Sequence, residues 1–90
     1  MTERSLQITY RKGRPFAAYH YLSRATSEKS MRSEATADGL LVVDFAADGN
    51  PIGIEITAPG SVTLERLNDT LRRIGQPPLA DAEFRPLAAA

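Results

Sequence analysis

Asp44 and Glu55 are the side chains whose types and spacing best suit chemistry. They lie in two apolar runs, LLVVDFA and PIGIEIT, that flank the sequence ADGN. If these runs pair as a hairpin, the two carboxylates lie diagonally on one face, roughly 7–8 Å apart at the backbone. At that separation they can share a cation or raise each other's pKa. Gly53 leaves space opposite Asp44 for a small ligand or metal ion. Because two acids bind a divalent ion weakly, solvated surface charges are the alternative.

His20, the only histidine, is the third candidate ligand and the candidate general base. Such a base needs a nucleophile and an orienting carboxylate, for which Ser23, Ser30 and Asp44 are available. No local catalytic motif accompanies His20, so we favour a structural histidine. One histidine excludes a two-histidine metal site within one chain, and the absence of cysteine excludes disulfides and thiolate chemistry. We therefore expect no catalytic residues, no enzymatic activity and no cofactor.

A basic turn is the third candidate site. Arg11, Lys12 and Arg14 surround Gly13, as in loops that bind phosphate, and a solvated turn is the alternative. The whole chain has 11 basic and 11 acidic residues and a pI near 6.6. It therefore lacks the net positive charge that non-specific nucleic-acid binding requires, and we expect no nucleic-acid partner.

The zero net charge is a cancellation between segments. Residues 1–37 hold seven basic and three acidic side chains, residues 38–60 hold none and four, and residues 61–90 hold four and four. Opposite charges attract over this range, within one chain or between chains. We expect the basic N-terminal strands and the acidic hairpin to attract each other, inside the molecule or across a dimer.

The elements that position these residues are strands in the first two-thirds of the chain. Leu6, Ile8 and Tyr10 alternate with polar residues and predict one strand, and residues 16–22 predict a second. The pattern does not decide which face of the second strand is buried, although its two tyrosines favour theirs. The two faces consist of Phe16, Ala18, His20 and Leu22, and of Ala17, Tyr19 and Tyr21. Residues 23–30 predict a loop and residues 31–35 a third strand.

The hairpin around Asp48-Gly49 is the strongest pattern, because both residues tolerate the positive φ that a two-residue type I′ turn needs. Such a turn pairs residues that lie equally far along the chain on either side of Asp48-Gly49. The predicted pairs are Phe45 with Ile52, Val43 with Ile54, Leu41 with Ile56, Val42 with Glu55, and Asp44 with Gly53. The first three pairs are apolar and fall on one face, which supports the register.

Helical spacing is confined to the last third of the chain. Ser61 or Thr63 can cap a helix, an apolar stripe follows with Asn68 among the polar positions, and Gly75 with two prolines predicts the end. We expect one amphipathic helix over about residues 61–74 and a tail, residues 75–90, that folds back or frays. The predicted fold is one α+β domain, residues 1–90: an antiparallel β-meander of four to five strands, about residues 6–57, packed by that helix.

The run GLLVVDFAADGNPIGIEITAP resembles the signature of a bacterial family called domain of unknown function 2283. The matching residues are Ile8, Thr9, Tyr10, Ala18, Tyr19, Leu22, Val42, Val43, Asp44, Phe45, Asp48, Gly49, Ile52, Gly53, Ile54, Glu55 and Ile56. Phe45 stands where tyrosine is usual, Arg14, Pro15 and Phe16 replace acidic residues, and the C-terminal helix is an extension. The resemblance covers about residues 6–57 and implies a compact β-meander without an established catalytic or ligand residue. Some members resemble partners in toxin–antitoxin-like gene pairs.

One helix can cover only one face of the sheet, which leaves Tyr19, Tyr21, Leu40 and Val42 as a candidate interface. Edge strands also gain protection by pairing with a second copy. We expect a non-enzymatic interaction module that forms a homodimer or binds a small protein partner, in the manner of an antitoxin. The competing hypothesis is a weak metal- or ligand-binding protein or enzyme that uses Asp44, Glu55 and His20.

The sequence also bears on location. Its first residues, MTERSLQITYRKGR, contain no apolar run typical of a signal peptide. No stretch approaches the roughly 18 apolar residues of a membrane span. We therefore expect a cytoplasmic protein without a membrane partner.

Overall fold

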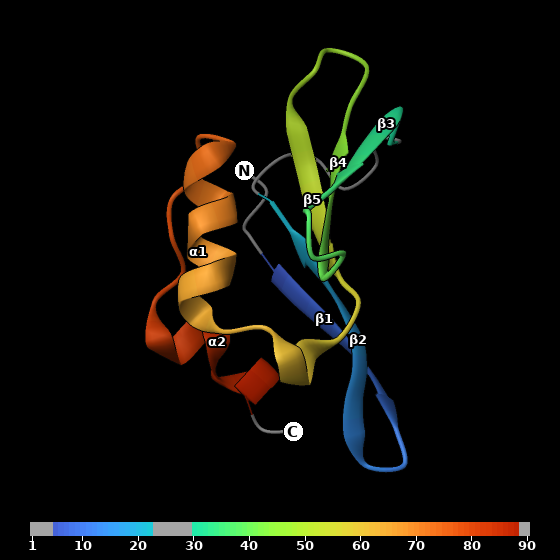
Figure 1. Ribbon diagram of the computed structural model, residues 1–90, viewed down its shortest axis with the longest axis vertical. Coiled ribbons are helices and arrows are strands. Elements are labelled where there is room, and N and C mark those ends of the chain that lie inside the picture. The colour runs from blue at the N-terminus through green and yellow to red at the C-terminus, as the bar shows by residue number, and fades with distance from the viewer. Residues whose placement is uncertain (1–4, 23–29, 89–90) are drawn as a thin grey trace.

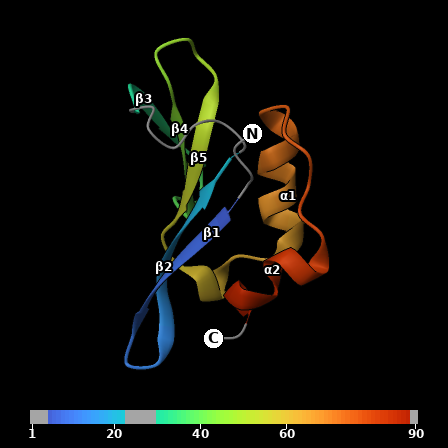
Figure 2. The same ribbon diagram turned by 180° about the vertical axis from the view of Figure 1, so that it is seen from behind.

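A computed structural model of the chain describes residues 5–22 and 30–88. It contains an antiparallel sheet and two helices, so the predicted α+β class is confirmed. Figure 1 shows both helices on one side of the sheet, and Figure 2 shows the same arrangement from behind. The elements are β1 (Ser5–Arg11), β2 (Arg14–Tyr21), β3 (Arg32–Ala35), β4 (Leu41–Phe45), β5 (Pro51–Ile56), a 3₁₀ turn (Pro59–Ser61), α1 (Leu64–Arg73) and α2 (Asp81–Ala88).

The order of strands in the sheet is β1-β2-β5-β4-β3, so the chain departs from an unbroken meander between β2 and β3. Burial explains why β5 and not β3 lies beside β2. Three consecutive residues of β5, Ile52, Gly53 and Ile54, are buried, as suits a central strand. Every residue of β3, with the sequence RSEA, is exposed, as suits a short polar edge strand.

The predicted hairpin register is confirmed for the four pairs from Leu41 with Ile56 to Asp44 with Gly53, and wrong at the turn. The turn has three residues: Ala46 N–H donates to the Asn50 carbonyl, and Gly49 adopts a φ of +86°. A three-residue loop moves the register by one, so Phe45 pairs with Pro51 and not with Ile52. A bulge at Ile52 then moves it back. The two irregularities cancel, which is why the predicted inner pairs are correct.

The buried face of β2 is the face opposite to the one that the tyrosines favoured. Ala18, His20 and Leu22 are 4%, 2% and 0% exposed, whereas Tyr19 and Tyr21 are half-buried on the other side. A tyrosine retains a hydroxyl that needs a partner, and on this side of the sheet it can keep that hydroxyl near water. Small and branched residues therefore take the side that the helices cover.

One hydrophobic core joins the sheet to both helices. Its fully buried members include Leu41, Ile54 and Ile56 from the sheet and Leu67 and Leu71 from α1. Helix α1 begins at the predicted cap: the Thr63 hydroxyl accepts a hydrogen bond from Arg66 N–H at 3.1 Å. It ends at Arg73 with Ile74 as the C-cap, and the next residue, Gly75, has a φ of +74° that suits a residue without a side chain.

The described part of the tail, residues 76–88, is held in place by a buried amide. Asn68, predicted to be exposed, is 8% exposed, because its side chain holds both backbone groups of Leu79. Its Oδ1 accepts from Leu79 N–H at 2.7 Å, and its Nδ2 donates to the Leu79 carbonyl at 3.1 Å. This clamp turns the chain back, so that Phe84 and Leu87 of α2 reach the core. Neither helix in the described ranges has the length and apolarity to cross a membrane.

Candidate functional site

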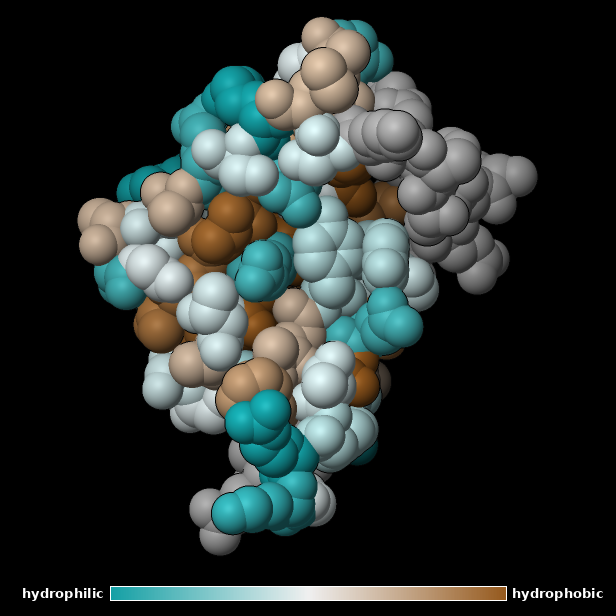
Figure 3. Space-filling view, turned by 90° about the vertical axis from the view of Figure 1, so that its right-hand side faces the viewer, coloured by the Kyte–Doolittle hydropathy of each residue, from teal (hydrophilic) through white to brown (hydrophobic). Residues whose placement is uncertain are grey.

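The face of the sheet opposite the helices is the candidate site, and we call it the outer face. Cross-strand pairing and alternation assign it Ser5, Gln7, Thr9, Ala17, Tyr19, Tyr21, Ser33, Ala35, Val42, Asp44, Gly53 and Glu55. Figure 3 views the molecule from this side: hydrophobic and weakly polar residues are mixed across the middle, and strongly hydrophilic ones gather at the β1–β2 tip below.

Tyr19 is the central residue of the outer face. Its ring lies across Gly53 of the neighbouring strand, where an added Cβ would collide with the phenol oxygen. This path lets the hydroxyl cross β5 and donate to Asp44 Oδ2 on β4 at 2.8 Å. Tyr21 packs edge-on against the Tyr19 ring, with the centroids 4.7 Å apart. Glycine at position 53 therefore allows one side chain to bridge three strands.

Each carboxylate oxygen of Asp44 accepts a hydrogen bond from a neighbouring side chain. Ser33 donates to its Oδ1 at 2.6 Å, and Tyr19 donates to its Oδ2. The pKa of Tyr19 lies well above its usual value near 10. The largest cause is burial of the phenol, and the second is its hydrogen bond to Asp44. The network thus fixes a neutral tyrosine against a carboxylate on the outer face.

This hydrogen-bond network alters the ligand site that the sequence predicted at Asp44 and Glu55. Asp44 and Glu55 share the outer face and lie diagonally, as predicted, but the space over Gly53 is filled by the Tyr19 ring. His20 lies on the inner face, because it alternates with Tyr19 and Tyr21 along β2. The three candidate ligands therefore do not come together, and the described residues contain no group of three His, Asp or Glu side chains able to hold a metal ion.

His20 occupies a buried position beneath the C-terminal segment. It lines a cavity of about 200 Å³ together with Ser5, Leu6, Leu79 and Glu83. Asp44 is on the opposite face and Ser30 is exposed, while Ser23 and the rest of residues 23–29, predicted as a loop, lie outside the described residues. Asp44 and Ser30 therefore do not supply His20 with the carboxylate and the nucleophile that a general base needs.

The basic turn has the backbone of a two-residue hairpin. Lys12 and Gly13 have φ values of 53° and 78°, and Arg11 pairs with Arg14 across the turn. The Arg11 guanidinium lies 4.3 Å from the centroid of the Phe16 ring, so its nearest described partner is aromatic. The Arg14 side chain lies outside the described residues, and the three predicted phosphate ligands are therefore not placed as a group.

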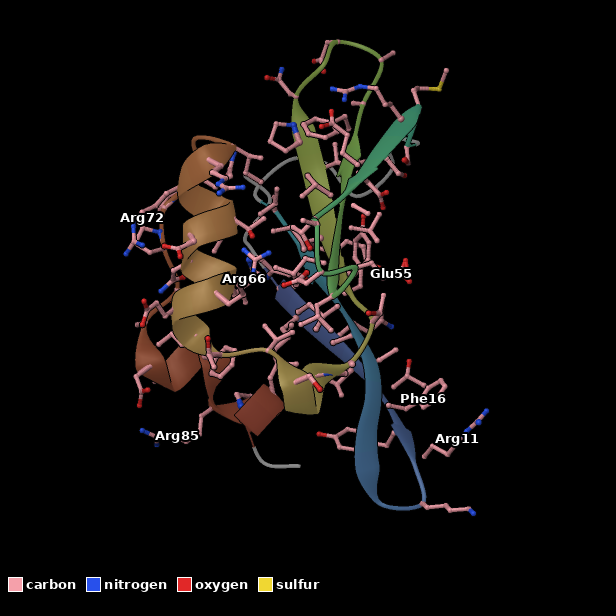
Figure 4. The ribbon with its side chains drawn as sticks, viewed as in Figure 1. Arg11, Phe16, Glu55, Arg66, Arg72 and Arg85 are labelled. Atoms are coloured by element: carbon pink, nitrogen blue, oxygen red, sulfur yellow. The ribbon has the colours of Figure 1, made fainter. Side chains whose placement is uncertain are left out.

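Three of the four candidate interface residues lie on the outer face. Tyr19, Tyr21 and Val42 are half-buried there, whereas Leu40, which directly precedes β4, packs against the core cluster. The sequence pattern missed Phe16, which is 50% exposed. The register shifts between Thr9 and Tyr10, which leaves Phe16 without a cross-strand partner. Figure 4 shows it projecting on the outer side beside Arg11.

The outer side of the sheet is charged unevenly. Arg11 and Lys12 lie at the β1–β2 tip, and Asp44 and Glu55 lie on the two strands farther along the face. Between them β2 carries its aromatic residues.

Compared with protein-family models, curated proteins and solved structures, the chain has no significant match in any of the three searches. Its function must therefore be inferred from this face.

Proposed function

We propose that the chain is a non-enzymatic interaction module that forms a homodimer through its outer face. The observation that carries the proposal is a five-stranded sheet with both helices packed on one face, so that no other described helix or strand covers the opposite face (Figures 1 and 2). Sheet faces left open with aromatic residues are a frequent form of protein interface. We further propose a cytoplasmic bacterial protein, distantly related to the domain of unknown function 2283 family through residues 6–57.

The aromatic residues along β2 form the centre of the proposed interface. Phe16 is half exposed, and the Tyr19 and Tyr21 rings are held in an edge-to-face pair. Asp44 fixes the Tyr19 hydroxyl, so little rotamer freedom remains to be lost on association. Rigid aromatic side chains at the middle of a patch are typical of the residues that dominate binding energy.

Charge complementarity favours a second copy as the occupant. Arg11 pairs with Arg14 on β2, and Glu55 pairs with Tyr19, so the basic and acidic levels are roughly 15 Å apart along the strand. Ala17 lies between them. A two-fold axis in the plane of the interface, midway between Arg11 and Glu55 and perpendicular to the line that joins them, places Arg11 of each copy opposite Glu55 of the other. Figure 4 shows both side chains projecting from the outer side of the sheet.

The size of the face sets the expected strength. Five strands span about 24 Å at about 4.8 Å per strand, and a strand length of roughly 20 Å limits the overlap to roughly 500 Å² in projection. The area that two such surfaces would bury together lies at the lower end of the range for specific protein interfaces. We therefore expect micromolar, reversible association and not an obligate dimer.

A metal- or ligand-binding function for Asp44, Glu55 and His20 is less well supported. Both Asp44 oxygens accept hydrogen bonds, and a cation would have to displace Ser33 or Tyr19 to gain full access. The His20 side chain lies on the opposite, inner face of the sheet. The geometry supports an aromatic contact surface better than a coordination site.

Sedimentation equilibrium from about 5 to 500 µM tests the proposal. We expect a shift from monomer to dimer, weakened by salt because the ion pairs are exposed. A clean monomer at the highest concentration overturns self-association and leaves a protein of another kind as the occupant of the face.

Charge exchange tests the two-fold arrangement. Arg11→Glu or Glu55→Arg alone should weaken dimerisation about tenfold, because each change disrupts two symmetric pairs worth roughly 0.2–1 kcal/mol each. The double variant should recover most of the loss. Arg85→Glu is the matched control, since Arg85 lies on α2, away from the outer face (Figure 4). If the double variant is as weak as the single ones, this pairing is wrong.

A further inference from the structure

A groove of about 620 Å³ lies on the other side of the sheet, between the end of α1 and the inner face of the β3–β4–β5 region, and we call it the β3–α1 groove. It is independent of the outer face and of the proposed dimer. Its lining includes Arg32, Val43, Phe45, Thr70, Arg73 and Ile74. We infer that this groove binds a small organic anion: an aromatic or apolar body that carries one carboxylate or phosphate group.

The groove exists because the sheet extends beyond the helix that covers it. Strand β3 and the β4–β5 turn continue past the end of α1, as Figure 1 shows. The Arg66 guanidinium bonds Asp38 at 2.9 Å and ties α1 to the turn between β3 and β4. Figure 4 shows Arg66 pointing from the helix toward the sheet. This tie limits how far the helix can approach or leave the edge strand, and so fixes one end of the groove.

The interior of the groove suits an apolar or aromatic body. Val43 is 4% exposed, and Phe45 and Ile74 are half-buried against the same core. The Arg32 guanidinium lies 4.1 Å from the centroid of the Phe45 ring. A volume of this size is within the range that small-molecule sites occupy, about 300–1,000 Å³.

The charge balance of the groove favours an anion. Arg32 forms an ion pair with Glu34, another residue of the lining, so these two charges cancel. Arg73 forms no ion pair with any residue in the described ranges 5–22 and 30–88. A guanidinium presents a planar fork of donors that fits a carboxylate or a phosphate. The remaining charge of the lining is therefore positive and of a suitable geometry.

Three carbonyl groups at the end of α1, those of Thr70, Leu71 and Arg72, already accept backbone hydrogen bonds. Gln76 N–H donates to the Leu71 carbonyl at 2.8 Å, and Gly75 N–H donates to the Arg72 carbonyl at 3.1 Å. These bonds form a Schellman turn, which satisfies carbonyl groups that a helix end otherwise leaves open. An anion that meets Arg73 therefore meets few unpaired acceptors beside it.

Amide chemical shifts provide the test. Phenyl phosphate and phenylacetate, titrated separately into ¹⁵N-labelled protein at physiological salt, should move the Val43, Phe45 and Ile74 amides with millimolar dissociation constants. The two probes distinguish a phosphate from a carboxylate as the preferred anion. Benzyl alcohol, which has the ring without the charge, and inorganic phosphate, which has the charge without the ring, should bind more weakly.

Two neighbouring arginines supply a matched pair of variants. Arg73→Gln should weaken phenyl phosphate binding roughly two- to fivefold, the effect of one exposed ion pair. Arg72→Gln should not, because Arg72 pairs with Asp69 and points away from the sheet (Figure 4). Equal effects of the two variants, or equal shifts with benzyl alcohol, overturn the assignment. Folding of each variant is checked by the dispersion of its spectrum.

Discussion

Gly53→Ala tests the central contact of the outer face, because the Tyr19 ring occupies the space that an alanine methyl group needs. The added Cβ would collide with two carbon atoms of that ring and with its hydroxyl oxygen, so the ring must move. Moving it breaks the 2.8 Å hydrogen bond to Asp44 and the edge-on packing with Tyr21. Replacing glycine by alanine within a strand otherwise stabilises the fold, because glycine loses more conformational freedom on folding.

These terms decide the sign and size of the effect. A hydrogen bond to a charged group contributes roughly 1.5–3 kcal/mol and an aromatic pair roughly 0.5–1.5 kcal/mol, while the loss of glycine returns roughly 0.5–1 kcal/mol. Because the network is only half-buried, we expect a net loss of about 2 kcal/mol in the free energy of unfolding. For a chain of this length that corresponds to a fall of about 10 °C in Tm.

A double-mutant cycle with Tyr19→Ala isolates the cause. Once the ring is absent, Gly53→Ala should be neutral or slightly stabilising in thermal and urea unfolding. An equal loss of stability with and without Tyr19 would show that the ring does not lie over Gly53. In the wild type, the raised pKa of Tyr19 delays its ionisation relative to an ordinary tyrosine, and in Gly53→Ala an ultraviolet titration should show that delay reduced.

Three further substitutions test individual contacts elsewhere in the fold. Asn68→Ala should cost about 2 kcal/mol and expose the α2 amides to hydrogen exchange, because the buried backbone of Leu79 loses both partners; unchanged protection of α2 would contradict the clamp. Thr63→Ala should cost about 1 kcal/mol in urea unfolding, whereas Thr63→Ser should restore the cap. Hydrogen bonds from Arg66, Thr36 and Leu40 hold the pKa of Asp38 well below its usual range, so its stabilising effect is present above pH 4 and is lost as the pH falls toward that lowered value. Asp38→Asn should therefore lower the urea midpoint at pH 7 more than at pH 3, and an equal change at both pH values would count against the ion pair.

The local sequence determined α1 and the β4–β5 hairpin because each has a periodic pattern that its own residues carry. The apolar stripe and the Thr63 cap predict α1, and the alternation in residues 41–56 predicts which residues face each other in the hairpin. From that register alone, Asp44, Glu55 and Val42 could be assigned to one face. This part of the candidate site was therefore predictable.

Tertiary structure decided the residues that connect the elements. A period of two is the same for both faces of a strand, so only packing by the helices could assign His20 to the inside and Tyr19 to the outside of β2. The bulge that leaves Phe16 unpaired and the close approach of Tyr19 to Gly53 arise between strands, where no local pattern reports them. Asn68 is polar and fits an exposed helix position by pattern, yet it is buried because Leu79 presents two backbone groups to it. The sequence by itself determined strands, helix and one hairpin; the contacts among distant segments decided the buried face, the strand order and the composition of the outer face.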